Sequence, residues 1–352
     1  MAKSMDKPAL APHFRLTGAL FGAFIADALA MPVHWYYDTA ALAKDYGWVT
    51  DFAKPRNPHP DSILWRSRYH PLRPEADILH NQAKFWGQRG VHYHQFLEAG
   101  ENTLNLKISQ LLMDSLLEKE EYDQELYLDK YVAFMTTPGA HKDTYVEECH
   151  REFFKAWAPQ KKTPAAHLPD EKHIGGLCLP LPLLLFFQDQ WDKALQLAEC
   201  HLELTHPGTL MRNALACFAD LLHDILHGAD VRQSLKKNRP KPLQLLCGYP
   251  FAELSSRADT DIARNVFSTA CYIEQSLPLT LYLAWKYQDD PEQALMVNTN
   301  LGGDNCHRGV VLGALLGALH GEQAWPRRWM DGLAHPPTAF SQWLATRFKT
   351  DA

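Results

Sequence analysis

The sequence predicts an all-helical fold, and three observations support this prediction. Apolar residues recur every three or four positions in several segments, alternating strand-like runs are scarce, and Gly and Pro clusters separate the segments. The segments with helical period are 104–117, 181–187, 191–204, 210–226, 260–287 and 309–319. The chain has 352 residues, 46% of them hydrophobic, so it can bury a large core.

The first helix is expected over residues 17–30, where small residues recur at four-residue spacing. The stripe consists of Gly18, Gly22, Ala26 and Ala30. Residues four apart lie on one face of an α-helix, so the stripe lets another helix approach closely. Membrane helices also use such stripes, but Asp27 interrupts this segment and Pro32 ends it short of a full span. We therefore predict a buried helix and no membrane partner.

The last helix carries a matching stripe, and the turn before it is the most informative part of the chain. The stripe consists of Gly309, Gly313, Gly317 and Gly321, and the turn reads Gly302-Gly303-Asp304-Asn305-Cys306-His307. A glycine turn at a helix N-terminus suits the binding of an anion, hydroxyl groups or a metal ion. We predict that the two stripes cross in the core.

The segment 51–98 lacks helical period and is rich in aromatic, His and Pro residues. We expect a long excursion that packs over the domain. Its polar and aromatic residues either line a ligand pocket or pack, and the same holds for a second group after the Thr-Pro-Gly turn. The candidates are His80, Asn81, Trp86, His92, Tyr93 and His94, and then His141, Asp143, Thr144 and Tyr145.

Charge and cysteine usage exclude several classes of protein. The net charge is −6 and the pI is about 6.3, so neither nucleic acid nor an anionic membrane surface is an expected partner. The polar N-terminal lead lacks the apolar core of a signal peptide. Seven cysteines without CxxC spacing indicate reduced thiols. We expect a cytoplasmic location.

Five landmarks, in order along residues 17–321, resemble the ADP-ribosylglycohydrolase family, which includes J1-crystallin-like relatives. They are the helix with Asp27, the turn Gly100-Glu101-Asn102-Thr103, the loop Thr205-His206-Pro207, the helix after Tyr272 and the turn Gly302-Gly303-Asp304. The resemblance implies an all-α orthogonal helical bundle, which we take as one domain over residues 1–352. It also implies that the two acidic turns meet in one cleft, which commonly holds two magnesium ions.

The metal-binding positions depart from the family pattern. Glu101-Asn102 stands where relatives have two aspartates, and Asp304-Asn305-Cys306-His307 stands where they have Asp-x-Asp-Thr. Because four carboxylates fall to two, two divalent ions held side by side would repel each other with little compensation. We therefore expect one Mg²⁺ ion or none, with Glu101, Asn102, Asp304 and Asn305 as its ligands.

The resemblance implies hydrolysis of an N- or O-glycosidic bond to ribose, in an ADP-ribosylated protein or a small ribosyl conjugate. Glu101 and Asp304 are the expected catalytic acidic pair, and His34 is the candidate base because the pKa of imidazole lies near neutrality. The residues expected to bind the substrate, an ADP-ribose-like molecule, are Asn102, Gly302, Gly303, Asn305, Cys306 and His307. His34, Cys306 and His307 also leave open a thiolate nucleophile or a softer metal site.

Other readings stand beside this hypothesis. Capping alone explains Asn102 and Thr103, and Asp27 is expected to be a hydrogen-bonded structural tie. Asp259-Thr260-Asp261 resembles a metal signature, but an acidic first helical turn accounts for it. As an alternative function, the protein is a catalytically silent member that binds ADP-ribose or a nucleotide, or a structural, crystallin-like protein. The loss of two carboxylates supports that alternative.

Overall fold

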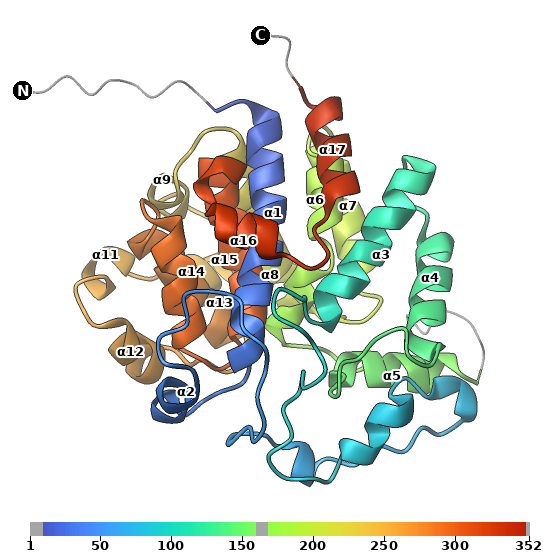
Figure 1. Cartoon of the computed structure of the whole chain (residues 1–352). Coiled ribbons are helices and arrows are strands. Elements are labelled where there is room, and N and C mark those ends of the chain that lie inside the picture. Colours follow the sequence, from blue (N-terminus) through green and yellow to red (C-terminus); the bar gives the residue numbers. More distant parts are fainter. Residues whose placement is uncertain (1–9, 160–167, 350–352) are drawn as a thin grey trace, which may run out of the picture.

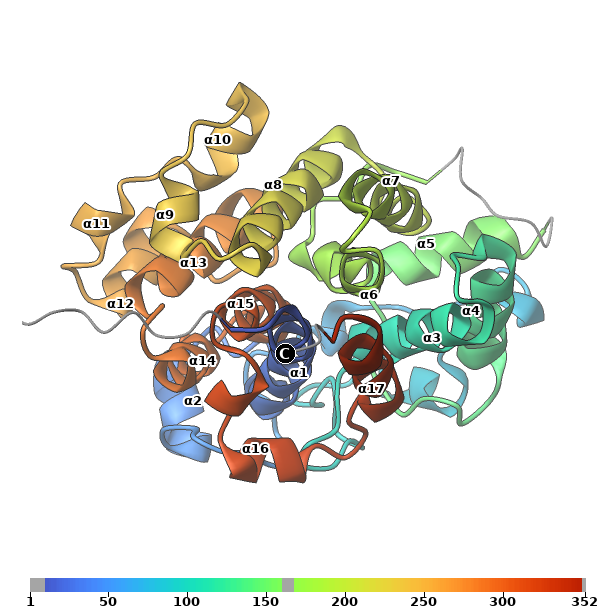
Figure 2. The same cartoon turned by 90° about the horizontal axis from the view of Figure 1, so that it is seen from above.

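Two antiparallel helices, α1 (Pro12–Ala30) and α15 (Asn305–His320), cross at the centre of the fold (Figures 1 and 2). A Cβ atom built on Gly22 would lie 2.1 Å from the carbonyl oxygen of Gly313, and one built on Gly317 would lie 1.9 Å from that of Gly18. Backbone therefore packs directly on backbone, and no side chain fits between the helices. The predicted crossing of the two stripes is confirmed.

The remaining helices surround this pair, as the computed structural model of residues 10–159 and 168–349 shows. They are α2 (Thr39–Tyr46), α3 (Leu104–Lys119), α4 (Gln124–Thr136), α5 (Glu148–Trp157), α6 (Leu181–Phe186), α7 (Trp191–Leu202), α8 (Thr209–Leu226), α9 (Val231–Leu235), α10 (Lys241–Cys247), α11 (Phe251–Leu254), α12 (Asp259–Asp261), α13 (Ile273–Lys286), α14 (Pro291–Asn300), α16 (Arg327–Gly332) and α17 (Thr338–Arg347). Within these described ranges there is no β-strand, and one isolated bridge joins His173 to Tyr272. In Figure 2, α1 is seen nearly end-on whereas α5 runs across the view, as in an orthogonal bundle. The all-α prediction is confirmed.

The central helix is longer than the sequence suggested. With the turn η1 (Met31–Val33), it forms a 22-residue segment, Pro12–Val33, that is long and apolar enough to cross a membrane. The expectation that it falls short of a span is wrong, because the helix begins at Pro12 and continues through Pro32. Its whole apolar window is buried inside the fold, which is typical of a core helix. The polar N-terminal lead used to predict a cytoplasmic location lies outside the described residues.

The prediction of one helix over 260–287 is wrong. The chain leaves helical geometry after Val266 and resumes it at Ile273. Between them, the carbonyl oxygen of Thr269 accepts hydrogen bonds from the backbone N–H of Asp304 (2.8 Å) and from Arg308 (2.9 Å). The segment between Val266 and Ile273 is therefore not helical, because its backbone carbonyl at Thr269 is used to bind the turn before α15 and Arg308.

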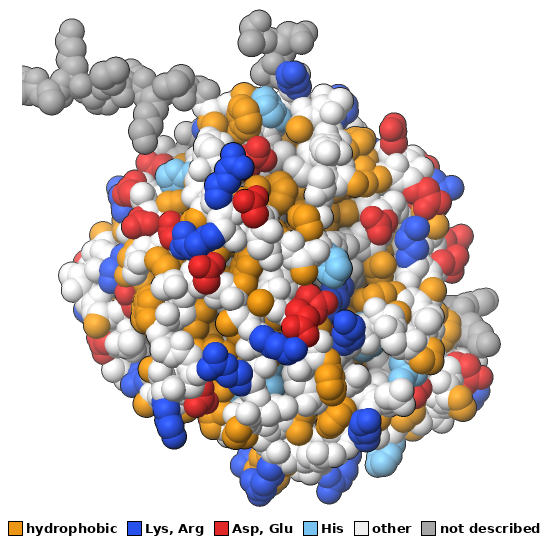
Figure 3. All heavy atoms as spheres, in the orientation of Figure 1, with side chains coloured by type: hydrophobic (Ala, Val, Ile, Leu, Met, Phe, Trp, Pro, Cys, Tyr) orange, Lys and Arg blue, Asp and Glu red, His pale blue; other side chains and the backbone are white. Residues whose placement is uncertain are grey.

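The excursion over residues 51–98 contains only short single turns. They are η2 (Leu64–Arg66), η3 (Pro74–Ala76) and η4 (His80–Phe85). Leu64, Val91 and Tyr93 pack with Trp35, the second residue after η1. The prediction that this segment packs over the domain is confirmed. On the face shown in Figure 3, acidic and basic side chains are interspersed and neither sign dominates.

Candidate active site

The site is built around Asp304, the residue just before α15. Its Oδ1 atom lies 3.0 Å from Nε2 of His34 and 2.9 Å from Nδ1 of His307, one helical turn further along. The three side chains are 0%, 1% and 3% exposed. Burial would raise the pKa of Asp304, but His307 and His34 outweigh it and hold this pKa well below its usual range. The structure therefore contains a buried, ionised carboxylate between two imidazole rings.

Gly302 and Gly303 position this carboxylate. Both have positive φ, and a Cβ atom on either would lie 2.1 Å from a backbone carbonyl oxygen, that of Tyr36 or Thr269. The N–H of Gly303 donates to Tyr36 (2.6 Å) and that of Gly302 to Thr299 (3.2 Å). The prediction that these glycines bind substrate is therefore corrected: their N–H groups are already used within the protein.

The same turn holds Trp35 in an unusual backbone conformation. Trp35 has φ = 61°, in the left-handed region that bulky residues rarely adopt. Its N–H donates to the carbonyl oxygen of Gly303 (2.8 Å), and its ring stacks on His34 with centroids 3.8 Å apart. The strained residue thus links the Asp304 turn to the neighbouring cavity.

A buried polar chain leads away from Asp304 through His34, His94 and Asp143 to Lys107. Nδ1 of His34 lies 2.8 Å from Nε2 of His94, and Nδ1 of His94 lies 3.1 Å from Oδ1 of Asp143. Lys107 donates to Oδ2 of Asp143 (3.1 Å). Burial would raise the pKa of Asp143, but Lys107 and His94 lower it well below its usual range. His94 and Asp143, both weak candidates from the sequence, therefore belong to the site.

His34 itself is not an open base. Burial lowers its pKa to about 3, even though the Asp304 carboxylate opposes that shift. Both of its ring nitrogens already have partners, Asp304 and His94. The predicted role of His34 as a base facing the substrate is therefore corrected to that of a neutral ring that positions Asp304.

A second carboxylate stands on the far side of His307. Nε2 of His307 lies 3.8 Å from Glu147 and 3.1 Å from the amide of Asn105, which also donates to Glu147 (2.7 Å). Burial lowers the pKa of His307, but Asp304 and Glu147 raise it by more, to about 9. The sequence reasoning missed Glu147 and Asn105. Asn105 lies one helical turn after Glu101 and Asn102, and that spacing was an available signal.

A cavity of about 170 Å³, the aromatic pocket, adjoins this group. It is lined by Trp35, Tyr37, Ile63, Tyr93, Tyr145, Glu147, Glu148, His173 and Cys271. Glu147, with 16% of its side chain exposed, joins the pocket to His307. Tyr93 and Tyr145 were candidates from the sequence, whereas Tyr37, His173 and Cys271 were missed because they lie far apart along the chain.

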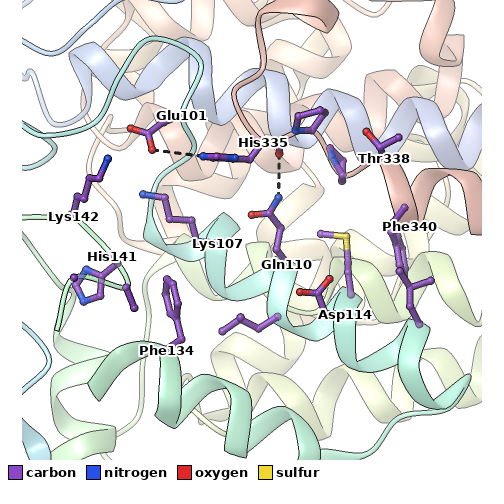
Figure 4. A pocket seen from close by; sticks show the side chains of 18 residues that line it. Glu101, Lys107, Gln110, Asp114, Phe134, His141, Lys142, His335, Thr338 and Phe340 are labelled. Atoms are coloured by element: carbon purple, nitrogen blue, oxygen red, sulfur yellow. Dashed lines mark hydrogen bonds and ion pairs between the residues drawn. The ribbon is translucent and has the colours of Figure 1, made fainter. Parts of the chain in front are cut away.

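Glu101 lines a different cavity, the open cavity, of about 520 Å³ (Figure 4). Its Oε2 accepts a hydrogen bond from the N–H of Glu98 (2.6 Å), and its Oε1 lies 3.8 Å from His335. Within the described residues, Glu101 makes no hydrogen bond or ion pair with Asp304, His34 or His307. The predicted pairing of Glu101 with Asp304, as catalysts and as metal ligands, is therefore not found.

Asp27 explains this separation. Its carboxylate accepts hydrogen bonds from Oγ1 of Thr103 (2.6 Å), the N–H of Thr103 (2.8 Å) and the amide of Asn102 (2.9 Å). Asn102 and Thr103 therefore face α1, and Glu101, in the preceding extended position, faces the open cavity. Asp27 is the structural tie that the sequence indicated.

The other predicted ligands also serve the fold. The amide nitrogen of Asn102 further donates to Phe24 (2.8 Å), and that of Asn305 donates to Thr299 (2.8 Å) and Val33 (3.3 Å). Neither amide contacts the Asp304 carboxylate among the described residues. The amide nitrogens of Asn102 and Asn305 thus tie the two turns to their neighbours. Both amide oxygens are buried without a hydrogen-bond partner among the described residues, and their predicted substrate and metal roles stay predictions.

Cys306 points away from Asp304, as a residue two positions along a helix does. It packs with Ala30, Met31 and Leu97, and its Sγ lies 3.6 Å from the carbonyl oxygen of Asp27. Burial raises the pKa of its thiol well above the usual value. The thiolate nucleophile, the soft metal site with Cys306 and its substrate role are therefore corrected: Cys306 is a core residue.

The other histidines and acidic residues singled out in the sequence have structural partners. His92 lies 3.0 Å from the carbonyl oxygen of Pro32, His141 lies 2.8 Å from that of Ile78, and Trp86 donates to that of Thr144 (2.8 Å). His80 faces Asp77 at 3.5 Å, and Asn81 is exposed. Asp259 accepts hydrogen bonds from Tyr282, Lys286 and Tyr287, as expected for an acidic turn without a metal role.

The donor set does not fit a pair of magnesium ions. Mg²⁺ prefers oxygen ligands in octahedral geometry, whereas Asp304 is grouped with two imidazoles. Among the described residues, two groups have ligand atoms within 4.8 Å of one another: His34, Asp304 and His307, and Glu147, Cys149 and His150. Glu101 belongs to neither.

The fold and the site thus define an all-α protein with a buried carboxylate–histidine centre beside an aromatic pocket. The family model for ADP-ribosylglycohydrolase matches residues 9–351, so the chain belongs to the ADP-ribosylglycohydrolase family. This membership indicates a glycohydrolase activity on ADP-ribosylated substrates in general.

A solved structure described as an ADP-ribosylglycohydrolase-related protein complex is similar in fold, with a TM-score of 0.66 and 21% identity over 96% of this chain and 98% of that chain. At this identity, the likeness supports the fold alone. A comparison with curated proteins gives no match.

Proposed function

We propose that the protein hydrolyses the bond between C1 of a ribose and its leaving group, with the sugar bound in the aromatic pocket. One observation carries this proposal. Oδ2 of Asp304 is buried and has no hydrogen-bond partner among the described residues, although the carboxylate is ionised. A buried anion with one free oxygen stabilises the positive charge that develops on ribose in an oxocarbenium-like transition state.

Glu147 is the second carboxylate of the proposed reaction. It lines the pocket and is separated from Asp304 by the ring of His307. Glycoside hydrolysis commonly uses two carboxyl groups, one of which activates water or protonates the leaving group. We assign that proton transfer to Glu147 and charge stabilisation to Asp304. His307 positions both carboxylates.

The pocket volume favours a small substrate. At about 170 Å³ it lies below the roughly 300–1,000 Å³ typical of sites for drug-sized ligands. A ribosyl unit with its leaving group would fill it, and a diphosphate would have to lie outside. We therefore favour a small ribosyl conjugate over the intact ADP-ribose of a modified protein.

The assay is release of free ribose or ADP-ribose from a panel of ribosyl conjugates, followed by mass spectrometry. The protein should turn over at least one conjugate, and Asp304→Asn and Glu147→Gln should abolish turnover. Glu101→Gln is the matched control, because it changes a carboxylate on the open cavity. Full activity of Asp304→Asn would rule out the proposed site.

The second candidate is a binding protein without turnover. The observation that favours it is that only one of the two acidic turns contributes a carboxylate to the buried centre. Calorimetry with ADP-ribose separates the two candidates, since saturable binding with no turnover of any conjugate supports the silent alternative.

We also propose a cytoplasmic location. All seven cysteines are free thiols, which suits a reducing compartment. Fractionation of cells that produce the full chain tests it, and recovery of the protein from any other compartment would contradict it.

A further inference from the structure

We propose that His34, Asp304 and His307 bind one divalent transition-metal ion of the Mn²⁺, Fe²⁺, Co²⁺ and Zn²⁺ class, in place of the magnesium pair that the family resemblance implies. Two imidazoles and one carboxylate are the donor set that such ions prefer over Mg²⁺. The inference goes beyond the proposed hydrolysis, because it stands on ligand geometry and requires no particular substrate.

The first argument is the spacing of the ligand atoms. Two donors bound to one ion at about 2.1 Å lie about 3.0 Å apart at an octahedral right angle, and about 3.4 Å apart at a tetrahedral angle. Oδ1 of Asp304 lies 3.0 Å from Nε2 of His34 and 2.9 Å from Nδ1 of His307. Oδ1 of Asp304 is therefore spaced from each imidazole nitrogen as neighbouring ligands of an octahedral ion are, and all three ligand atoms lie within 4.8 Å of one another.

The imidazoles of the buried polar chain carry fewer ring hydrogens than the chain has contacts. The chain has three contacts between its two carboxylates: Asp143 to His94, His94 to His34, and His34 to Asp304. Two neutral imidazoles carry only two ring hydrogens. One contact therefore requires either an additional proton or a metal cation.

The direction of these hydrogen bonds places the additional proton or metal cation between His34 and Asp304. If His94 donates its Nδ1–H to Asp143, it accepts at Nε2 from His34. The lone pair on Nε2 of His34 then faces Asp304. A metal-binding histidine is typically held in this way, by donating its other ring N–H to a neighbour that is itself anchored by a carboxylate. Asp304 also has a buried oxygen, Oδ2, without a partner among the described residues.

The test is titration of the full-length, chelator-stripped protein with Co²⁺, followed by its visible absorption and by calorimetry. We expect one ion per chain, which a large excess of Mg²⁺ does not displace. X-ray absorption at the cobalt edge should show scattering from imidazole ligands. This measurement uses the unaltered protein, so it does not depend on the folding of any variant.

Variants then assign the ligands. His307→Ala and Asp304→Ala should lose Co²⁺ binding, and Asp143→Asn should weaken it about 10- to 100-fold by releasing His94. Glu101→Gln and Cys306→Ser are matched controls that should bind normally. Circular dichroism shows which variants remain folded.

Three results would overturn the proposal. They are absence of Co²⁺ uptake, which would assign the third contact to a proton; displacement of Co²⁺ by Mg²⁺; and loss of binding in Glu101→Gln. Because uptake is measured without substrate, these results leave the ribosyl hydrolysis assay to be judged separately.

Discussion

The aromatic pocket and the open cavity differ in almost every property that bears on function. The open cavity is about three times larger and contains Glu101, Lys107, Asp114, His141, Lys142 and His335 among its lining residues (Figure 4). The aromatic pocket is small, but a buried carboxylate with a strongly lowered pKa stands behind it. The two cavities thus separate the larger volume from the strongly perturbed carboxylate, and our proposal follows the carboxylate because perturbed pKa values cluster at functional sites.

The two cavities lie at opposite ends of the buried polar chain. Asp304 ends it beside the aromatic pocket, and Lys107 ends it in the lining of the open cavity. The chain through His34, His94 and Asp143 thus connects the Asp304 turn to the lining of the open cavity, which also contains Glu101.

The largest expected difference between the cavities is in catalysis. Asp304→Asn removes the buried charge and should lower kcat about 10³-fold or more, the scale of losing a preorganised electrostatic group. Glu101→Gln should change kcat less than about threefold, because Glu101 lines the open cavity and makes no contact with Asp304, His34 or His307 among the described residues. Steady-state kinetics on one conjugate measures both. Equal losses in the two variants would remove the distinction.

Acid should lower the stability of the fold through buried histidines, three of which line neither cavity. Burial lowers the pKa of His150, His201 and His206 to about 3 each. These groups stay neutral in the native state but take up protons in the unfolded chain below about pH 6.5. The native state therefore loses stability as pH falls, by up to about 4 kcal/mol per pH unit for the three groups.

Urea unfolding at pH 7, 6 and 5 measures this loss. His201→Asn should reduce the slope by about 1.4 kcal/mol per pH unit, because it removes one histidine that is buried in the neutral form. A stability that does not change between pH 7 and 5 would show that these histidines are not buried as described.

The crossing of α1 and α15 sets the distance between His34 and Asp304, so a change there should disturb the group around Asp304. A Cβ atom at Gly317 would lie 1.9 Å from the carbonyl oxygen of Gly18. Gly317→Ala should therefore lower the free energy of unfolding by about 1–3 kcal/mol and also lower activity, since the helices must separate.

Gly139→Ala is the control for this change. Gly139 also has a positive φ, 84°, but no atom lies within 4 Å of its added Cβ. Gly139→Ala should lower the free energy of unfolding by about 1 kcal/mol, because only the backbone conformation is strained, and should leave activity unchanged. If both variants lost the same stability and activity, close helix contact would not be what positions the site.

The smallest expected effect concerns substrate stacking. Trp35→Leu should raise KM about fivefold, since an aromatic contact contributes about 1 kcal/mol, and should change kcat less. Phe134→Leu in the lining of the open cavity is the matched control and should leave KM unchanged. The pocket assignment fails if Phe134→Leu has the larger effect.

Much of the fold followed from the sequence, because local periodicity determines it. The predicted helix 104–117 appears as Leu104–Lys119, and the predicted helix 210–226 appears as Thr209–Leu226. The glycine stripes specified a long-range contact, since only bare backbones pack that closely. The break within 260–287 could not be predicted, because it arises from hydrogen bonds that Thr269 makes to a turn far along the chain.

The site was less accessible to sequence reasoning. Asp304, His34 and His307 were identified because they stand at a glycine turn and near a family motif. Glu101 was assigned to them only because two acidic turns were expected to meet. Its direction depends on Asp27, which captures the next two side chains. Glu147, Asn105 and Lys107 lie in ordinary helical or loop sequence, and only tertiary packing brings them to the centre.

The central claim is that the sugar binds beside Asp304 and not beside Glu101. A crystal structure of the protein soaked with ADP-ribose tests it most directly. We predict ribose density between Trp35 and Tyr37, within hydrogen-bonding distance of Glu147. Density for the ribose in the open cavity, against Glu101 and His335, would contradict the account.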